Sequence, residues 1–188
     1  DGAAVESAMD RLKTLVRLAD ERGMVVDVTL HRGGVLKTHE AHLNAVRAIA
    51  TNLQPWRNLY IDVANERNLG GVRHVSIEEV RELRDGIREI DPQRLVTASD
   101  TGALPRERLV EYVLEADLDL ITPHLPRNAG DPARTEDRLR QYLAWMQEMG
   151  RSVPVHLQEP FRRDWREWQP EAADFLTDLR GAVAGGAA

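Results

Sequence analysis

The sequence Leu59-Tyr60-Ile61-Asp62-Val63-Ala64 is a short, mostly apolar run that ends directly in the polar pair Asn65-Glu66. A run of this length and composition is typical of a strand that is buried on both faces and leads into a loop. Amphipathic segments at about 38–52 and 76–90 flank it, with apolar residues three and four positions apart. The pattern therefore predicts one buried strand between two helices.

The same alternation extends outward along the chain in both directions. It predicts further strands at about 24–30, 94–99, 119–123 and 153–158, and further helices at about 5–22, 105–116, 132–149 and 170–183. The sequence Ser76-Ile77-Glu78-Glu79 is typical of a capped helix start. Strict alternation with short connections predicts a parallel sheet with right-handed crossovers, in one domain that spans residues 1–188.

Two α/β architectures fit this order, the open doubly wound sheet and the closed (β/α)8 TIM barrel. Gly33-Gly34 and Gly70-Gly71 lack the spacing of a phosphate-binding loop, which weighs against a nucleotide-binding sheet. The barrel is therefore favoured. A complete barrel needs about 250 residues, so we expect an incomplete one that begins and ends with a helix.

Composition narrows the classes of function. The 188 residues carry a formal net charge of −6 with both signs interleaved, which argues against nucleic acid as a partner. No apolar run is long enough to span a membrane, and the chain has no signal-peptide pattern. With no cysteine, thiolate metal sites and a Cys nucleophile are excluded.

Polar residues gather where the predicted strands end, which is where a barrel of this kind carries its reactive groups. The strand ends offer His31 and Arg32, Asn65 and Glu66, Ser99 and Asp100, His124, and Gln158 and Glu159. Glu66 and Glu159 are carboxylates able to converge across the barrel mouth. Cleavage of a glycosidic bond needs such a pair, one to protonate the leaving oxygen and one to attack or to direct water.

The strand that ends in Asn65-Glu66 resembles the fourth strand of the clan A glycoside hydrolases, above all family 5. The segment ending in His31 resembles the third strand, the one ending in His124 the sixth, and Val153-Pro154-Val155-His156-Leu157-Gln158-Glu159 the seventh. The resemblance implies a TIM barrel that runs from the second helix to the seventh, without strands one, two and eight.

The resemblance also implies the roles of individual residues. Glu66 would be the acid/base and Glu159 the nucleophile of a retaining hydrolase that acts on a β-linked glycan without a cofactor or metal. Asn65 would bind the sugar 2-hydroxyl, and His31 and His124 would line the subsite. Trp165, in the loop after the last predicted strand, could stack on a sugar ring or only pack its loop.

Other interpretations stay open at this point. The chain could be a non-catalytic carbohydrate-binding or scaffold module, or a metal-dependent barrel hydrolase, although it has no H-x-H or H-E-x-x-H motif. Glu66 could pair with Arg67 or Arg73, and Glu159 with Arg162 or Arg163, in solvated loops. His39 and His42 are expected to face solvent. The glycan, the oligomeric state and the localisation are left undetermined.

Overall fold

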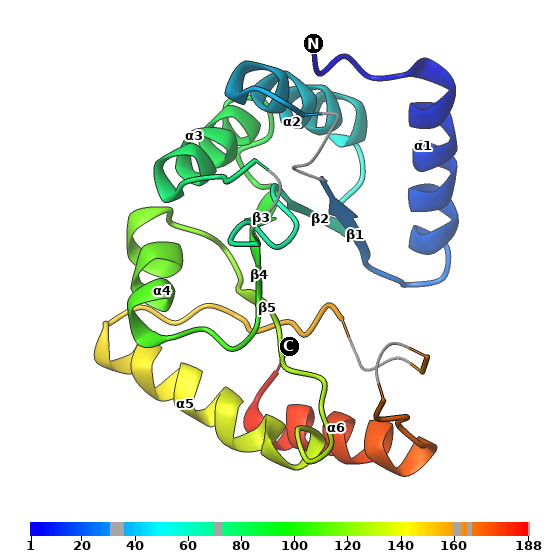
Figure 1. The fold of residues 1–188 in the computed structure, drawn as a ribbon. Helices are drawn as coiled ribbons and strands as arrows, with labels where there is room; N and C mark the ends of the chain where they lie inside the picture. Colours follow the sequence, from blue (N-terminus) through cyan, green and yellow to red (C-terminus); the bar gives the residue numbers. More distant parts are fainter. Residues whose placement is uncertain (31–35, 70–72, 160–162, 165–166, 188) are drawn as a thin grey trace.

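The computed structural model describes residues 1–30, 36–69, 73–159, 163–164 and 167–187. Helices and strands alternate along most of these residues, although β3 is followed directly by β4 and α5 by α6 (Figure 1). The elements are α1 Glu6–Asp20, β1 Val26–Thr29, α2 His39–Leu53, β2 Leu59–Asp62, α3 Ile77–Arg88, β3 Leu95–Thr97, β4 Ser99–Thr101, α4 Arg106–Val110, the π-helical turn η1 Glu111–Glu115, β5 Thr122–His124, the 3₁₀ turn η2 Pro132–Arg134, α5 Thr135–Glu148 and α6 Ala172–Gly185.

The strands pair side by side in chain order, and every pair is parallel. β1 pairs with β2 and β2 with β3, while β4 pairs with β5. Figure 1 shows the helices placed around this row of strands, with α2 and α3 near β1 to β3 and with α5 and α6 beyond β5. The predicted α/β class with a parallel sheet is confirmed. Within the described part of the chain, the strands do not close into a barrel.

Local sequence signals explain the helix boundaries. The Thr38 side chain accepts a hydrogen bond from the Ala41 N–H at the start of α2. Ser76 and Glu79 form the predicted capping box of α3, each side chain bonding the other's backbone N–H. The inward faces of the helices bury Val46, Leu83 and Leu139, which join the core beside the strands. Among the described residues, no helix is long and apolar enough to cross a bilayer.

The strand predicted over 153–158 is wrong in extent, because only Val155 pairs, in a parallel bridge with Ile121. Ile121 N–H donates to the Pro154 carbonyl at 3.0 Å, and His156 N–H donates to the Ile121 carbonyl at 3.0 Å. The next donor in this ladder would be residue 123, which is a proline without an N–H. The ladder of hydrogen bonds therefore ends after this bridge, and residues 157–159 are not part of a strand.

The strand predicted over 94–99 is divided at Ala98 into β3 and β4. The Ser99 N–H donates to the Asp62 Oδ1 atom at 3.1 Å. A side-chain acceptor on β2 thus holds the backbone at the point where the regular pairing with β2 stops. The hydrogen bond from the Ser99 N–H to the Asp62 side chain holds Ser99 beside the end of β2, where the candidate site begins.

Candidate active site

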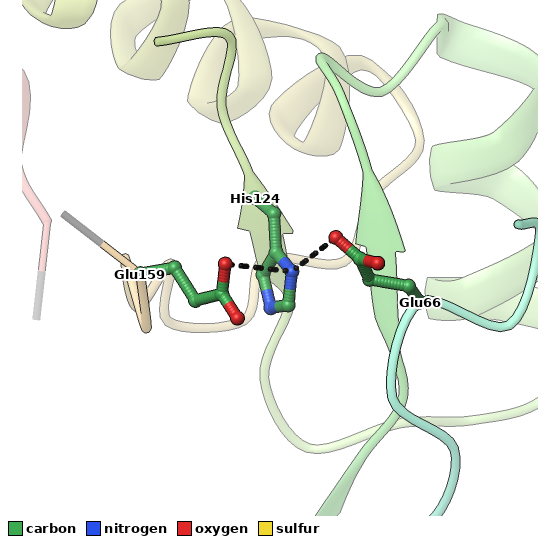
Figure 2. A group of neighbouring side chains, drawn as sticks. All are labelled: Glu66, His124 and Glu159. Atoms are coloured by element: carbon green, nitrogen blue, oxygen red, sulfur yellow. Dashed lines mark hydrogen bonds and ion pairs between the residues drawn. The ribbon is translucent and has the colours of Figure 1, made fainter. Parts of the chain in front are cut away.

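Two carboxylates from distant parts of the chain meet at the ends of the strands. Glu66 follows β2, Glu159 follows the bridged segment at Val155, and the His124 side chain at the end of β5 lies between them (Figure 2). His124 Nδ1 lies 3.1 Å from Glu66 Oε1 and 3.6 Å from Glu159 Oε2. One oxygen of each carboxylate and this nitrogen all lie within 4.8 Å of one another. The fold therefore brings together two glutamates that are 93 positions apart in the sequence.

The backbone at Glu66 is unusual and is held in place by Ser99. Glu66 has φ of 45°, in the left-handed region that residues with a side chain seldom adopt. Its N–H donates to the Ser99 Oγ atom at 2.9 Å, and the next N–H, of Arg67, donates to the Ser99 carbonyl at 3.1 Å. Strain of this kind persists only where the surroundings enforce it, and it is frequent at functional sites.

Arg67 anchors the same turn in the protein interior. Its guanidinium is buried and donates to the Tyr112 hydroxyl at 2.8 Å, to the Val75 carbonyl at 3.0 Å and to Glu111 Oε2 at 2.7 Å. Arg73 pairs instead with Glu79. The interpretation in which Glu66 pairs with Arg67 in a solvated loop is therefore wrong, because the Arg67 guanidinium is buried and bonded to other groups.

Glu159 has a cationic partner that the sequence did not reveal. Arg127, three residues after His124, forms an ion pair with Glu159 Oε2. Of the two arginines expected as partners of Glu159, Arg162 lies outside the described residues. Arg127 reaches Glu159 because both lie in loops at the same ends of neighbouring strands, which no local motif indicates.

His124 is buried, and its second ring nitrogen is also bonded. His124 Nε2 lies 3.1 Å from the Oε1 atom of Gln158, the residue before Glu159. The amide nitrogen of Gln158 faces β1 and β2, at 2.8 Å from Asp27 Oδ2, 3.3 Å from the Tyr60 hydroxyl and 3.4 Å from Asp62 Oδ2. Gln158 therefore connects the His124 imidazole to the carboxylates of Asp27 and Asp62.

Burial dominates the electrostatics of these acidic groups. Asp62 is fully enclosed, and desolvation raises its pKa from 3.8 to about 6, against hydrogen bonds from Ser99 and the Ala64 N–H that favour the ionised form. Burial also raises the pKa of Asp27, again partly offset by hydrogen bonds to its carboxylate. Burial raises the pKa of the Tyr60 hydroxyl as well. Two hydrogen bonds, both made by the Gln158 amide, thus connect Asp62 to His124.

A cavity of about 230 Å³ opens beside Glu66 and His124. Arg127 and Asn128 close one side, and Thr101 and Gly102 line another. This volume is below the roughly 300 to 1,000 Å³ of ordinary ligand pockets. It has the size of a single subsite next to Glu66.

The fate of the remaining predicted residues differs. Asn65 lies beside Glu66, and its N–H donates to the Leu30 carbonyl at 3.0 Å, which ties the end of β2 to the end of β1. His31 and Trp165 lie outside the described residues. The prediction that His42 faces solvent is wrong, because it is buried, with Nε2 2.6 Å from the Val63 carbonyl and Nδ1 2.6 Å from Arg73 Nη2. His39 is partly exposed and pairs with Glu79 and Glu82.

The group formed by Glu66, His124 and Glu159 could also hold a metal ion. Each residue offers one ligand atom, and a histidine nitrogen with carboxylate oxygens is a common donor set for divalent transition metals. The Arg127 ion pair already occupies one side of Glu159. A bound cation would have to share that carboxylate with the guanidinium.

Comparison with known proteins places this geometry in a known fold. No protein-family model and no curated protein matches the sequence. Solved structures do match. The catalytic domain of Thermobifida fusca endoglucanase Cel5A superposes with a TM-score of 0.62 at 17% sequence identity, over 95% of this chain and 60% of that one. The chain has the fold of a cellulase-like glycoside hydrolase.

Two further cellulase-like structures agree with this assignment of the fold. Thermotoga maritima Cel5A, solved with mannotriose, gives a TM-score of 0.69 at 13% identity over 98% of this chain and 70% of that one. A Cellulomonas fimi endo-β-1,4-mannanase gives 0.66 at 14% identity, over 97% and 51%. The resemblance predicted from the strand ends is confirmed at the level of fold. The chain spans 60% of the Thermobifida catalytic domain that it matches.

Sequence reasoning noted Ser99 and Gln158 only as polar residues at strand ends and did not single out Arg127, although the structure brings all three to this site. Ser99 ends a predicted strand, and Gln158 precedes a candidate catalytic residue, so position at a strand end was a usable signal for both. Arg127 had no such signal, since its role depends on how the loop after His124 folds.

Proposed function

We propose that this chain is the major part of a retaining glycoside hydrolase that cleaves a β-linked glycan, with Glu66 as acid/base and Glu159 as nucleophile. We further propose that the chain is one domain that forms part of an incomplete (β/α)8 barrel. In the numbering of a complete barrel, this part runs from the second helix to the seventh. The observation that carries the proposal is the convergence of two strand-end carboxylates on His124 in a fold shared with endoglucanases.

The separation of the carboxylates favours retention over inversion. Retaining enzymes hold the two carboxyl groups about 5 to 5.5 Å apart, whereas inverting enzymes leave about 6.5 to 9.5 Å for a water molecule. The nearest atoms of Glu66 and Glu159 lie within 4.8 Å. This oxygen–oxygen distance is closer to the spacing of retaining enzymes than to that of inverting ones.

The chemistry follows from this arrangement in two steps. A Glu159 oxygen attacks the anomeric carbon while Glu66 gives its proton to the leaving glycosidic oxygen, which forms a glycosyl ester on Glu159. Glu66, now ionised, takes a proton from water as that water attacks the ester from the same side as the departed sugar. Arg127 holds the Glu159 carboxylate in orientation through the ion pair.

A neutral sugar suits the surroundings of the carboxylates. The 230 Å³ cavity has room for one subsite, and Glu66 and His124 line it. We propose Asn65, next to Glu66, as a ligand of the sugar 2-hydroxyl on the strength of the sequence resemblance alone. Structures with the same fold were solved with cellotetraose, cellopentaose and mannotriose. We propose His31 and Trp165 as further sugar-binding residues on the strength of the sequence resemblance alone.

Covalent trapping tests the proposal directly. A 2-fluoro glycoside with a good leaving group should add one glycosyl unit to the chain, and peptide mass spectrometry should place it on Glu159. Glu159→Gln should abolish labelling. Glu66→Gln should lower the hydrolysis of unactivated glycosides by about 10² to 10⁴-fold, the usual contribution of general acid catalysis. Glu107→Gln, an exposed glutamate on α4, is the matched control and should label normally.

Failure to label would point to one of the alternative functions. A non-catalytic carbohydrate-binding module would bind a glycan, with the same affinity in the Glu159→Gln variant. A scaffold would not bind one. Labelling at a residue other than Glu159 would contradict the assignment of the nucleophile while leaving an enzymatic function in place.

A metal-dependent hydrolase is the second candidate, favoured by the three converging ligand atoms. Titration calorimetry with zinc chloride distinguishes it. Tight binding that is lost in His124→Asn, with activity removed by chelation and restored by zinc, would support this candidate. Activity that is unchanged by chelation supports the two-glutamate mechanism.

A further inference from the structure

The side chain of Gln158 is fixed in one orientation by what surrounds it. An ionised carboxylate only accepts hydrogen bonds, and an amide has distinct donor and acceptor ends. The 2.8 Å contact with Asp27 Oδ2 and the 3.4 Å contact with Asp62 Oδ2 therefore require the amide nitrogen on that side. The carbonyl oxygen of Gln158 must then face His124.

The fixed amide determines which imidazole nitrogen carries the proton. Gln158 Oε1 can only accept, so the 3.1 Å contact requires His124 Nε2 to donate. In a neutral imidazole, Nδ1 is then the acceptor. That nitrogen faces Glu66 Oε1 at 3.1 Å and Glu159 Oε2 at 3.6 Å.

We propose that Gln158 is a positioning residue that sets the tautomer of His124, so that the ring proton lies on Nε2 and Nδ1 is left to accept a hydrogen bond from Glu66. The proposal rests on the proposed function of Glu66 as the acid. An acceptor nitrogen 3.1 Å from its carboxyl gives the protonated Glu66 a partner, whereas a ring N–H there would pair with ionised Glu66.

The Gln158 amide lies among titratable and charged side chains from β1, β2 and the loop after β5, and the His156 side chain lies close to Tyr60 and Asp27. Asp27 on β1 and Asp62 on β2 hold the amide nitrogen, and Tyr60 offers its hydroxyl oxygen to the same nitrogen. Arg127 is engaged by Glu159. Burial raises the pKa of Asp62 to about 6, so above that pH the carboxylate is ionised and accepts from the amide. The orientation of Gln158 is therefore best defined at neutral pH and above.

The tautomer can be measured without substrate, by long-range ¹H–¹⁵N correlation spectra of the histidine side chains at pH 7.5. His42 supplies an internal reference, because the Val63 carbonyl requires a donor at Nε2 and Arg73 requires an acceptor at Nδ1. His124→Asn identifies the signals of His124. In the wild type, His124 should show the same pattern as His42, with Nε2 protonated and Nδ1 free of a proton.

Variants of Gln158 separate this role from simple packing. Gln158→Met keeps the length but offers no oxygen, and His124 should shift to mixed tautomers or to the Nδ1–H form, which can donate to Glu66 and Glu159. Gln158→Glu keeps an acceptor facing His124 but replaces the donor that faces Asp27 and Asp62, so it should show the Nε2–H pattern only at a pH where one of these three carboxyl groups carries a proton. Gln147→Met, an exposed glutamine on α5, is the control and should leave both histidines unchanged.

Kinetics supply a second measurement. Gln158→Met should lower kcat by about tenfold or more with little change in KM, since general acid–base catalysis depends on the proton's position. A wild-type His124 that is protonated on Nδ1, or a Gln158→Met variant that keeps the Nε2–H pattern, would overturn the proposal. If the tautomers behave as expected but no glycoside is cleaved, the proposed function fails and the assignment of the tautomer stands.

Discussion

Asp62 makes the stability of the fold depend on pH in a direction opposite to that of most carboxylates. Its side chain is fully buried, and desolvation raises its pKa from 3.8 to about 6. A tenfold difference in proton affinity corresponds to 1.36 kcal/mol, so the folded state binds this proton more tightly by about 3 kcal/mol. That contribution is fully present below pH 3.8 and is lost as the pH rises through about 6.

The Asp62→Asn variant isolates this contribution. The amide keeps an oxygen for the Ala64 and Ser99 N–H groups but has no charge to desolvate. Relative to the variant, the wild type should lose about 2 to 3 kcal/mol of unfolding free energy between pH 4 and pH 7. Any constant effect of the substitution cancels, because only the change with pH is compared. Urea unfolding followed by tryptophan fluorescence at half-unit pH steps measures it.

Asp91 provides a control of opposite sign. Burial would raise the pKa of Asp91, but the hydrogen bond from Arg57 and the charge of Arg94 outweigh it and hold the pKa below its ordinary value. Relative to Asp91→Asn, the wild type should therefore gain stability as the pH rises from about 2 to 4. A difference between wild type and Asp62→Asn that is constant with pH, or that has the sign found for Asp91, would refute the reasoning about Asp62.

Three further predictions concern the backbone around the site and the packing of the last helix. Ser99→Ala removes the Oγ acceptor of the Glu66 N–H and should cost about 1 to 3 kcal/mol in urea unfolding, with kcat lowered although both glutamates remain. Glu66→Gly should abolish hydrolysis but keep the unfolding free energy within about 1 kcal/mol of the wild type. Glycine adopts the positive φ without strain, and this gain offsets the greater entropy of the unfolded chain. A loss above about 2 kcal/mol would contradict this prediction. Gly185→Ala places a Cβ 2.8 Å from Leu139 Cβ and 3.0 Å from the Glu136 carbonyl oxygen. Because these contacts are too short, α6 must move away from α5, and the melting temperature should fall.

Much of the fold was predictable because it depends on short-range patterns. Apolar spacing placed all the helices, and the Ser76 capping box marked the start of α3. The β-branched runs gave β1 and β2 within about two residues at each end. These signals are local, and the buried side chains that produce them are the same ones that join the core.

The residues that were predicted incorrectly depend on contacts that are distant in sequence. His42 lies on a helix with charged neighbours, which suggested solvent, but the Val63 carbonyl and Arg73 satisfy both ring nitrogens in the interior. Arg127 approaches Glu159 only because two loops meet at the same sheet edge. Pairings of this kind follow from topology and cannot be read from periodicity.

Pro123 shows how one residue links the irregular sheet to the chemistry. Without an N–H at this position, the ladder between β5 and the segment after Val155 ends after a single bridge. Had the pairing continued, residue 158 would have donated its backbone N–H to residue 123, as the regular parallel pattern requires. The early end leaves Gln158 and Glu159 at the ends of the strands, where their side chains reach the two ring nitrogens of His124. A proline that weakens the sheet therefore contributes to the geometry on which both proposals depend.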